Sequence, residues 1–226
     1  AGKTINLFLV DGSASGMRIA EIGLSTIKAV VIPRASLTAL SKRDESKRTG
    51  VYFLVGADQK NPIKQRTYIG EGDSIISRLT SHDKDDSKDF WTEAIFFISK
   101  DENLTKAHGR YLEARFIALA KEANRYLLDN GTNPSEQGKL PEAAIAEMEE
   151  FISQAKLLLA TLGFNIFEPQ KNIVPEPSEL LEKKLVTFKY SGSGFKSASH
   201  VFHVLQVGVG VKCVFNVVSP ENKIVI

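Results

Sequence analysis

The chain has 226 residues, of which 42% are hydrophobic and 25% are charged. These values are ordinary for a folded protein and exclude wholesale disorder, and the length allows one domain with additions or two small domains. The net charge is only +2, which excludes an overall cationic field, so we expect any contact with phosphate to be local.

The content of cysteine and of long apolar runs narrows the cellular setting. The single cysteine, Cys213, excludes an intramolecular disulfide and a multi-cysteine zinc cluster. No stretch approaches the ~20 apolar residues of a membrane-spanning helix, and the first residues lack the apolar core of a secretory signal. We therefore expect a cytoplasmic protein that is neither exported nor embedded in a membrane.

The first 46 residues have the pattern of a small N-terminal β module. Three apolar runs, at residues 5–10, 18–22 and 29–32, are separated by turns rich in glycine and serine. A short helical pattern follows Pro33, and the charged stretch 41–48 indicates a solvated linker. We place a domain boundary there.

Residues 47–132 predict a core in which helices flank a small antiparallel β-sheet. Strand signals at 50–55 and 67–70 are joined by a polar stretch with a turn at Asn61-Pro62. Asp73 or Ser74 can cap the helix that follows. Next come a third strand at 94–98 and a longer helix at 103–128, whose apolar stripe is Leu112, Phe116, Leu119, Ala123 and Leu127.

The rest of the chain predicts a helical extension at 133–168 and a linker with a β-rich tail at 169–226. The helix of the extension is expected at 141–162, because Pro141 opens it and Gly163 follows it. The tail is rich in valine and glycine, which favours strands and turns. The predicted fold class is therefore α+β.

Two short tyrosine motifs in the core are followed by charged residues at helical positions. The motifs are Gly50-Val51-Tyr52 and Tyr68-Ile69-Gly70, on the first two strands. Arg78 and His82 then lie one turn apart on the next helix, and Tyr111-Leu112-Glu113 lies on the longer helix. Residues of these types in this order resemble the GIY-YIG nucleases.

Strand and helix geometry makes the set plausible in its own right. Alternate residues of a strand point to opposite faces, so Tyr52 shares a face with Gly50 and Leu54. Arg78 and His82 project from one helix face. Glu113 follows Leu112 by about 100° around its helix, which places it at the border of the apolar stripe.

The resemblance covers about residues 48–131 and implies an endonuclease that hydrolyses DNA phosphodiester bonds with a single divalent metal. Glu113 would hold the metal, which we expect to be Mg²⁺, with Mn²⁺ as the alternative. Arg78 would stabilise the charge that grows on the phosphate. Tyr52 would activate or position the attacking water, and Tyr68 and His82 would hold the phosphate or relay protons.

Each residue of the set also has a structural interpretation. Aromatic residues favour strands and fill cores, which accounts for Tyr52 and Tyr68. Arg78 is also consistent with an ordinary solvated helix residue, and Glu113 with an ion pair to Arg110, Arg115 or a neighbouring lysine. His82 is also consistent with a surface histidine near Asp83.

One residue departs from the family pattern. Many members carry a basic residue after the second motif, whereas this chain has Glu71, which would repel a phosphate unless it points away. Lys60, Lys64 and Arg66, in and after the long loop, are candidates for the missing basic contacts. The second hypothesis is therefore a catalytically weak or inactive module of the same fold that binds nucleic acid or a protein partner.

The tail offers weaker candidates for a site. His200 and His203 have no carboxylate or cysteine cluster to complete a metal site. The serine- and glycine-rich stretch 191–197 lacks the spacing of a phosphate-binding P-loop, so a turn is the better interpretation.

Overall fold

The computed structural model of the protein describes residues 2–131, residues 140–169 and the backbone of four short strands in the tail. The chain divides into two compact units, Ala1–Lys171 and Asn172–Ile226. In the second unit β8 (His203–Val207) pairs antiparallel with β9 (Gly210–Val214), and β10 (Val217–Val218) pairs antiparallel with β11 (Ile224–Val225). The stretch 191–197 and His200 lie outside the described residues.

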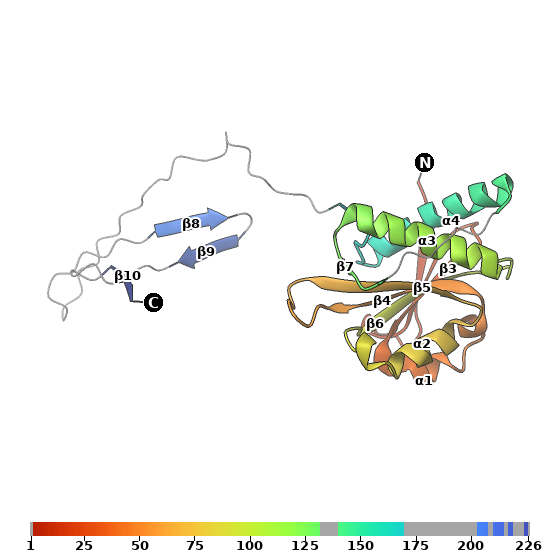
Figure 1. The fold of residues 1–226 in the computed structure, drawn as a ribbon, viewed down its shortest axis with the longest axis horizontal. Helices are drawn as coiled ribbons and strands as arrows, with labels where there is room; N and C mark the ends of the chain where they lie inside the picture. The colour runs from red at the N-terminus through yellow and green to blue at the C-terminus, as the bar shows by residue number, and fades with distance from the viewer. Residues whose placement is uncertain are drawn as a thin grey trace. The chain divides into compact units, whose positions relative to one another are not determined.

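The first unit is built around one seven-stranded sheet (Figure 1). The strand order is β1-β2-β3-β6-β4-β5-β7, and the neighbours are antiparallel except for the parallel pair β5 and β7. The protein is therefore α+β, as predicted. The strands are β1 (Ile5–Leu9), β2 (Arg18–Ile22), β3 (Ile27–Pro33), β4 (Gly50–Ala57), β5 (Gln65–Gly72), β6 (Glu93–Ser99) and β7 (Leu127–Leu128).

The sheet is larger than the small sheet that we expected. β3 pairs with β6 along its whole length, from Ile27 opposite Ser99 to Pro33 opposite Glu93. The strands of residues 1–46 and those of 47–132 therefore belong to one continuous sheet. Most residues of β3 and β6 are buried on both faces of the sheet. At an edge of the sheet, either strand would have buried backbone groups without hydrogen-bond partners, so both strands need a neighbour on each side.

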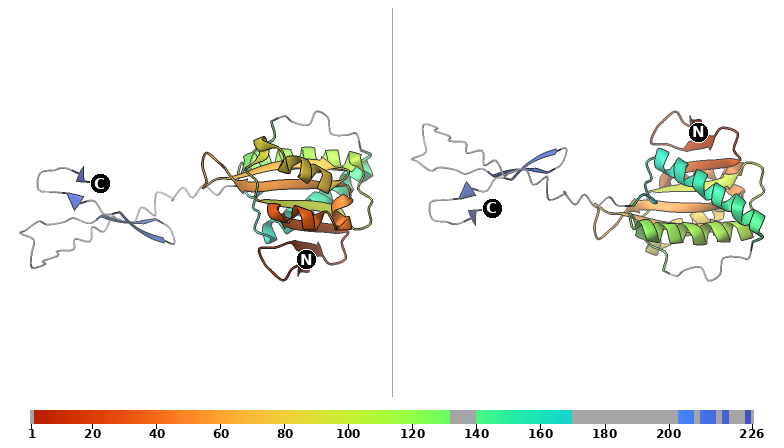
Figure 2. Two further views of the ribbon diagram at one scale, coloured as in Figure 1. Left: turned by 90° about the horizontal axis from the view of Figure 1, so that it is seen from below. Right: turned by 90° about the horizontal axis from the view of Figure 1, so that it is seen from above.

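Helices cover both faces of this sheet (Figures 1 and 2). The helices α1 (Leu37–Leu40) and α2 (Ile75–Asp83) lie on one face, and α3 (Lys106–Ala123) and α4 (Glu142–Thr161) lie on the other. Tyr52 and Leu54 pack toward α2, whereas Val51 and Phe53 pack toward α3. This alternation confirms the predicted facing of β4.

The helix α3 is shorter than the predicted helix at 103–128. It ends at Ala123, because Asn124 adopts the left-handed conformation with φ 46° and asparagine tolerates that conformation better than most residues. Leu127 continues the helical apolar spacing in the sequence but forms β7, which pairs with Arg66 and Thr67 of β5. The predicted helix at 141–162 is confirmed as α4, and its residues pack into the same core as those of α3.

Within the described residues, no helix combines the length and the apolar character that a membrane span requires.

Candidate active site

The two tyrosines of the motifs lie on neighbouring strands and share one face of the sheet. Tyr52 on β4 is 0% exposed, Tyr68 on β5 is partly buried, and their ring centroids are 6.3 Å apart. Tyr52 is paired with Gly70 in the ladder, and its side chain crosses that residue. A Cβ at Gly70 would overlap the Tyr52 hydroxyl, so glycine is needed for the ring to reach the edge of the sheet.

His82 completes an aromatic cluster with the two tyrosines. It is buried on α2, its Nε2 lies 2.7 Å from the Tyr52 hydroxyl, and its ring packs edge-on to Tyr68 at 5.0 Å. Burial lowers the pKa of His82, and the nearby charges of Arg78 and Lys88 lower it further. The imidazole is therefore neutral at pH 7, and we assign the Tyr52 hydroxyl as the donor to Nε2.

Arg78 extends from α2 over the end of β5. Its Cγ lies so close to Gly72 that a Cβ there would approach to 2.6 Å. The interaction with Tyr52 is the largest cause of the raised pKa of Arg78, and Tyr68 and Glu71 add to it. The guanidinium is thus a permanent positive charge that joins the tyrosines to a carboxylate.

Glu113 belongs to α3, on the other face of the sheet, and reaches the same site around the edge of β5. β7 covers only the start of this edge, and the side chain of Asn130 satisfies the backbone N–H and C=O of Ile69. Two residues further along, the Glu113 carboxyl lies close to the backbone of Glu71. Glu113 thus reaches the part of this edge that β7 does not cover, near Tyr52 and Arg78.

The Glu71 side chain lies close to Glu113. It packs on α3 at Gly109, where an added Cβ would be 3.4 Å from both its Cβ and its Oε2. Its Oε2 is buried and has no hydrogen-bond partner among the described residues. Burial and the charge of Glu71 raise the pKa of Glu113 to about 7, against the opposing charge of Arg78. The Glu113 carboxyl therefore takes up a proton near neutral pH, beside the side chain of Glu71.

The structure brings the five predicted residues together, but it changes how two of them can act. Tyr52 has no exposed surface, and burial, reinforced by Tyr68, raises its pKa. A free tyrosinate at position 52 is therefore excluded at neutral pH. His82 is buried against both tyrosines rather than paired with Asp83 at the surface, and Asp83 binds Arg34 instead.

The basic contacts differ from those expected from the sequence. Arg66 is held in ion pairs with Asp58 and Asp129. Lys88, which the sequence analysis did not single out, has its Nζ 4.3 Å from the centre of the Tyr68 ring and 2.5 Å from Asp129. Lys88 follows a run of charged residues that resembles any solvated loop, so the sequence carried no signal for it.

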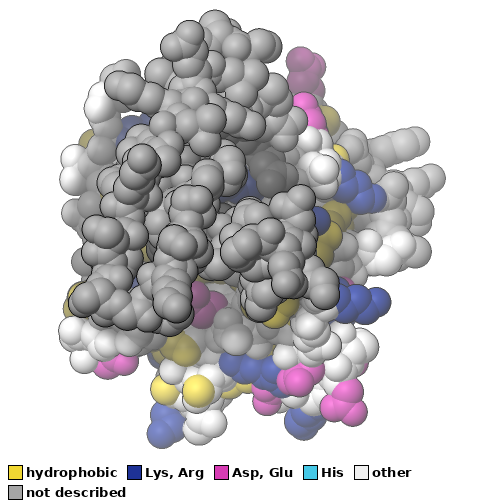
Figure 3. All heavy atoms as spheres, turned by 90° about the vertical axis from the view of Figure 1, so that its left-hand side faces the viewer, with side chains coloured by type: hydrophobic (Ala, Val, Ile, Leu, Met, Phe, Trp, Pro, Cys, Tyr) yellow, Lys and Arg dark blue, Asp and Glu magenta, His cyan; other side chains and the backbone are white. Residues whose placement is uncertain are grey.

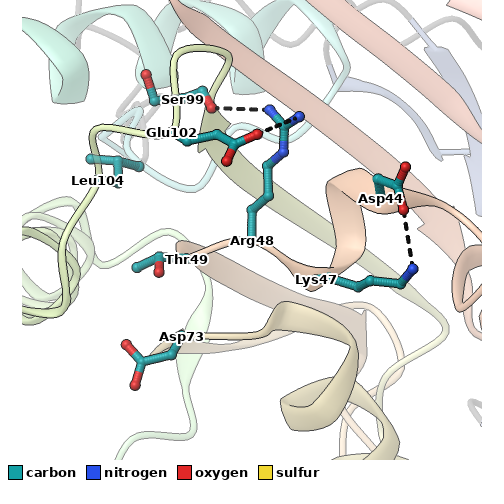
Figure 4. Close-up of a pocket in the computed structure, with 8 residues that line it drawn as sticks. All are labelled: Asp44, Lys47, Arg48, Thr49, Asp73, Ser99, Glu102 and Leu104. Atoms are coloured by element: carbon teal, nitrogen blue, oxygen red, sulfur yellow. Dashed lines mark hydrogen bonds and ion pairs between the residues drawn. The ribbon is translucent and has the colours of Figure 1, made fainter.

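A separate pocket lies at the ends of the strands (Figure 4). Its volume is about 470 Å³, and it contains none of the five predicted residues. Arg48 is paired with Glu102, and Lys47 with Asp44, so the charges around it are largely neutralised. The lining residues are Asp44, Lys47, Arg48, Thr49, Asp73, Ser99, Glu102 and Leu104.

Basic and acidic side chains are mixed on one face of the molecule (Figure 3), so the coloured part of that face has no purely cationic patch. Among the described residues there is also no group of three or more histidine, cysteine, aspartate and glutamate side chains that could hold a metal ion.

Comparison with protein-family models, with curated proteins and with solved structures finds no match for this chain. The chemistry of the site therefore has to be inferred from its own residues.

Proposed function

We propose that this protein is a metal-dependent endonuclease that hydrolyses DNA phosphodiester bonds, as the resemblance to the GIY-YIG nucleases implies. The observation that carries the proposal is the position of Arg78, whose charge interacts with Tyr52 and Tyr68 and with the carboxyl groups of Glu71 and Glu113. An arginine between hydroxyl groups and carboxylates is the arrangement that a phosphodiester needs, because the developing negative charge requires a fixed cation.

Arg78 is the residue that would stabilise the transition state. Its side chain is exposed, so a phosphate can reach the guanidinium, while Gly72 lets its stem lie flat on the strand. Removal of one preorganised donor of this kind costs about 3 kcal/mol of transition-state stabilisation, or about 100-fold in rate. Lysine would not replace it fully, since its ammonium lacks the bidentate geometry that suits a phosphate.

Tyr52 and His82 would carry the proton of the attacking water. The Tyr52 hydroxyl takes a proton from the water as it gives its own to Nε2 of His82, and the resulting hydroxide forms a bond to phosphorus as the bond to the bridging oxygen breaks. The departing alkoxide takes a proton from solvent, and the His82 imidazolium returns its proton to solvent. The neutral state of His82 and the 2.7 Å separation support this relay. Since Tyr52 is fully buried, the relay requires side chains at the edge of the sheet to move so that water can reach its hydroxyl.

The residues present fit a hard divalent cation. Glu113 and Glu71 are two adjacent carboxylates, and the second has a buried oxygen without a partner among the described residues. Mg²⁺ or Mn²⁺ suits such a pair, because Mg²⁺ is bound by one or two carboxylates together with waters and substrate oxygens. Glu113 would hold the ion with Glu71 beside it, and the ion would supply Lewis-acid stabilisation of the phosphate.

A cleavage assay tests the proposal. The purified chain is incubated with plasmid, branched and single-stranded DNA in the presence of Mg²⁺ or Mn²⁺, and Glu113→Gln is compared with Glu122→Gln, an exposed glutamate on the same helix. We expect metal-dependent cleavage that Glu113→Gln abolishes and Glu122→Gln preserves. Cleavage that survives both Arg78→Ala and Glu113→Ala rejects the proposal.

A second candidate is a module that binds nucleic acid or a protein partner without turnover. The complete burial of Tyr52 and the position of Glu71 in the site favour it. Salt-dependent binding of DNA, or binding of a protein partner, without metal-dependent cleavage would support this candidate. Cleavage that Arg78→Ala and Glu113→Ala abolish rejects this candidate.

A further inference from the structure

The strand β1 forms the outer edge of the seven-stranded sheet. Among the described strands it pairs with β2 alone, and Figure 2 shows it, next to the N label, at the margin of the sheet. Leu7 is 54% exposed and Phe8 is 59% exposed. The edge thus combines unpaired backbone groups with apolar side chains on both faces.

The hydrogen bonds to β2 fix which backbone groups point outward. Val10 donates to Met17 at 3.0 Å, and Gly23 donates to Thr4 at 2.9 Å. In an antiparallel ladder the bonded residues alternate, so the even-numbered residues of β1 bond to β2. The N–H and C=O groups of Ile5 and Leu7 and the N–H of Leu9 therefore point away from the sheet and are available to another strand, whereas the C=O of Leu9 accepts from the N–H of Gly12 at 3.2 Å.

This edge lacks the usual protection against pairing. Charged residues, prolines and bulges normally blunt an edge strand, but the sequence of β1 is Ile-Asn-Leu-Phe-Leu, with neither a charge nor a proline. The opposite edge of the sheet is partly protected, because β7 and the side chain of Asn130 cover part of β5.

We propose that β1 pairs antiparallel with β1 of a second copy of this chain about a two-fold axis at Leu7, so that the two sheets become one. In this register Leu7 faces Leu7, and Ile5 faces Leu9. The two Leu7 residues then form a hydrogen-bonded ring, and in each flanking pair the N–H of Leu9 donates to the C=O of Ile5. On the same face the cross-strand side chains are all apolar, which stabilises sheet pairing.

The self-complementary register is what favours a second copy over a different protein. A strand that carries apolar residues at the first, third and fifth positions presents the same pattern when it is reversed, and a two-fold axis requires this of an interface. Asn6 then lies opposite Phe8 on the other face, and no like charges meet. The proposal is independent of the nuclease chemistry, because it uses none of the residues of the candidate site.

Sedimentation velocity of the full chain tests the proposal, over concentrations from about 5 to about 500 µM, where small interfaces dissociate. We expect the wild type to form dimers as the concentration rises. Leu7→Pro removes an outward N–H and leaves the bonds to β2 intact, so we expect a monomer with an unchanged circular dichroism spectrum. Ile63→Lys, at a residue 93% exposed in the β4–β5 loop, is the control and should dimerise like the wild type.

Leu7→Lys provides a second variant in case proline disturbs the fold, because it changes only an exposed side chain. It should also be monomeric, since two lysines would face each other across the axis. A wild type that stays monomeric over the whole range overturns the proposal. So does a dimer that persists undiminished in Leu7→Lys, because its interface then lies elsewhere, for example in the strands after residue 203.

Discussion

The Tyr52 hydroxyl and Nε2 of His82 lie 2.7 Å apart in the buried layer between β4 and α2. Both groups are shielded from water, so the imidazole nitrogen depends on the Tyr52 hydroxyl for its hydrogen bond, while that hydroxyl also interacts with Arg78. In the proposed reaction the same pair, which holds α2 against the sheet, would also carry a proton to the imidazole. Stability and the proposed chemistry would therefore be coupled at this contact.

Loss of the imidazole should destabilise the protein. His82→Leu leaves the Tyr52 hydroxyl buried without its partner, which costs about 1–3 kcal/mol of the free energy of unfolding. Urea denaturation measures this difference. Tyr52→Phe combined with His82→Leu removes both polar groups, and we expect the double variant to be more stable than the sum of the single effects predicts. Strict additivity would contradict the proposed hydrogen bond.

The lowered pKa of His82 predicts a loss of stability in acid. The unfolded chain takes up a proton at His82 below about pH 6.5, whereas the folded chain resists it, so the free energy of unfolding falls as the pH drops through that range. Above that range the contribution is fully present. The difference between the wild type and His82→Gln, followed by thermal unfolding from pH 8 to pH 5, should change with pH; a constant difference would show that His82 is not perturbed.

Glu113 should act in the opposite direction. Its pKa is raised to about 7 by burial and by Glu71, so the folded chain binds a proton that the unfolded chain releases near pH 4.3. The free energy of unfolding therefore falls as the pH rises from about 4.3 to about 7 and stays lower above it. Glu113→Gln should be more stable than the wild type at pH 8 but not at pH 4, as measured by thermal unfolding. Equal stabilisation at both pH values would contradict this assignment.

Gly70 is predicted to be essential for the position of Tyr52. A Cβ at Gly70 overlaps the Tyr52 hydroxyl, so Gly70→Ala forces a buried ring and its hydrogen bond to shift, at a cost of about 1–3 kcal/mol. Gly131→Ala is a matched control, because none of the described residues places an atom within 4 Å of its added Cβ. Thermal unfolding of the two variants should separate them clearly, and an equal effect would mean that the ring can move freely.

The local elements of the site could be predicted from the sequence because they depend on short-range periodicity. Strand alternation placed Tyr52 on the face away from Val51, and helical spacing placed Arg78 and His82 together. The start of α4 followed from Pro141, since proline suits the first turn of a helix. Such features can be predicted from a few consecutive residues of the sequence.

Long-range pairing could not be predicted in the same way. Nothing in the sequence of β3 indicates that it pairs with β6, because two apolar strands fit many registers. The contact of Glu113 with the backbone of Glu71 depends on how α3 crosses the edge of β5. The complete burial of Tyr52 likewise depends on how segments distant in the sequence pack together. Tertiary packing decides these features, and they are the ones that determine the chemistry.

The most direct test of the nuclease is the single-turnover rate of plasmid cleavage by Arg78→Ala with Mg²⁺ or Mn²⁺. Because Arg78 links the tyrosines to the carboxylates, we predict a rate at least about 100-fold below that of the wild type, with thermal stability preserved because the side chain is exposed. A rate equal to that of the wild type would contradict the central role of Arg78.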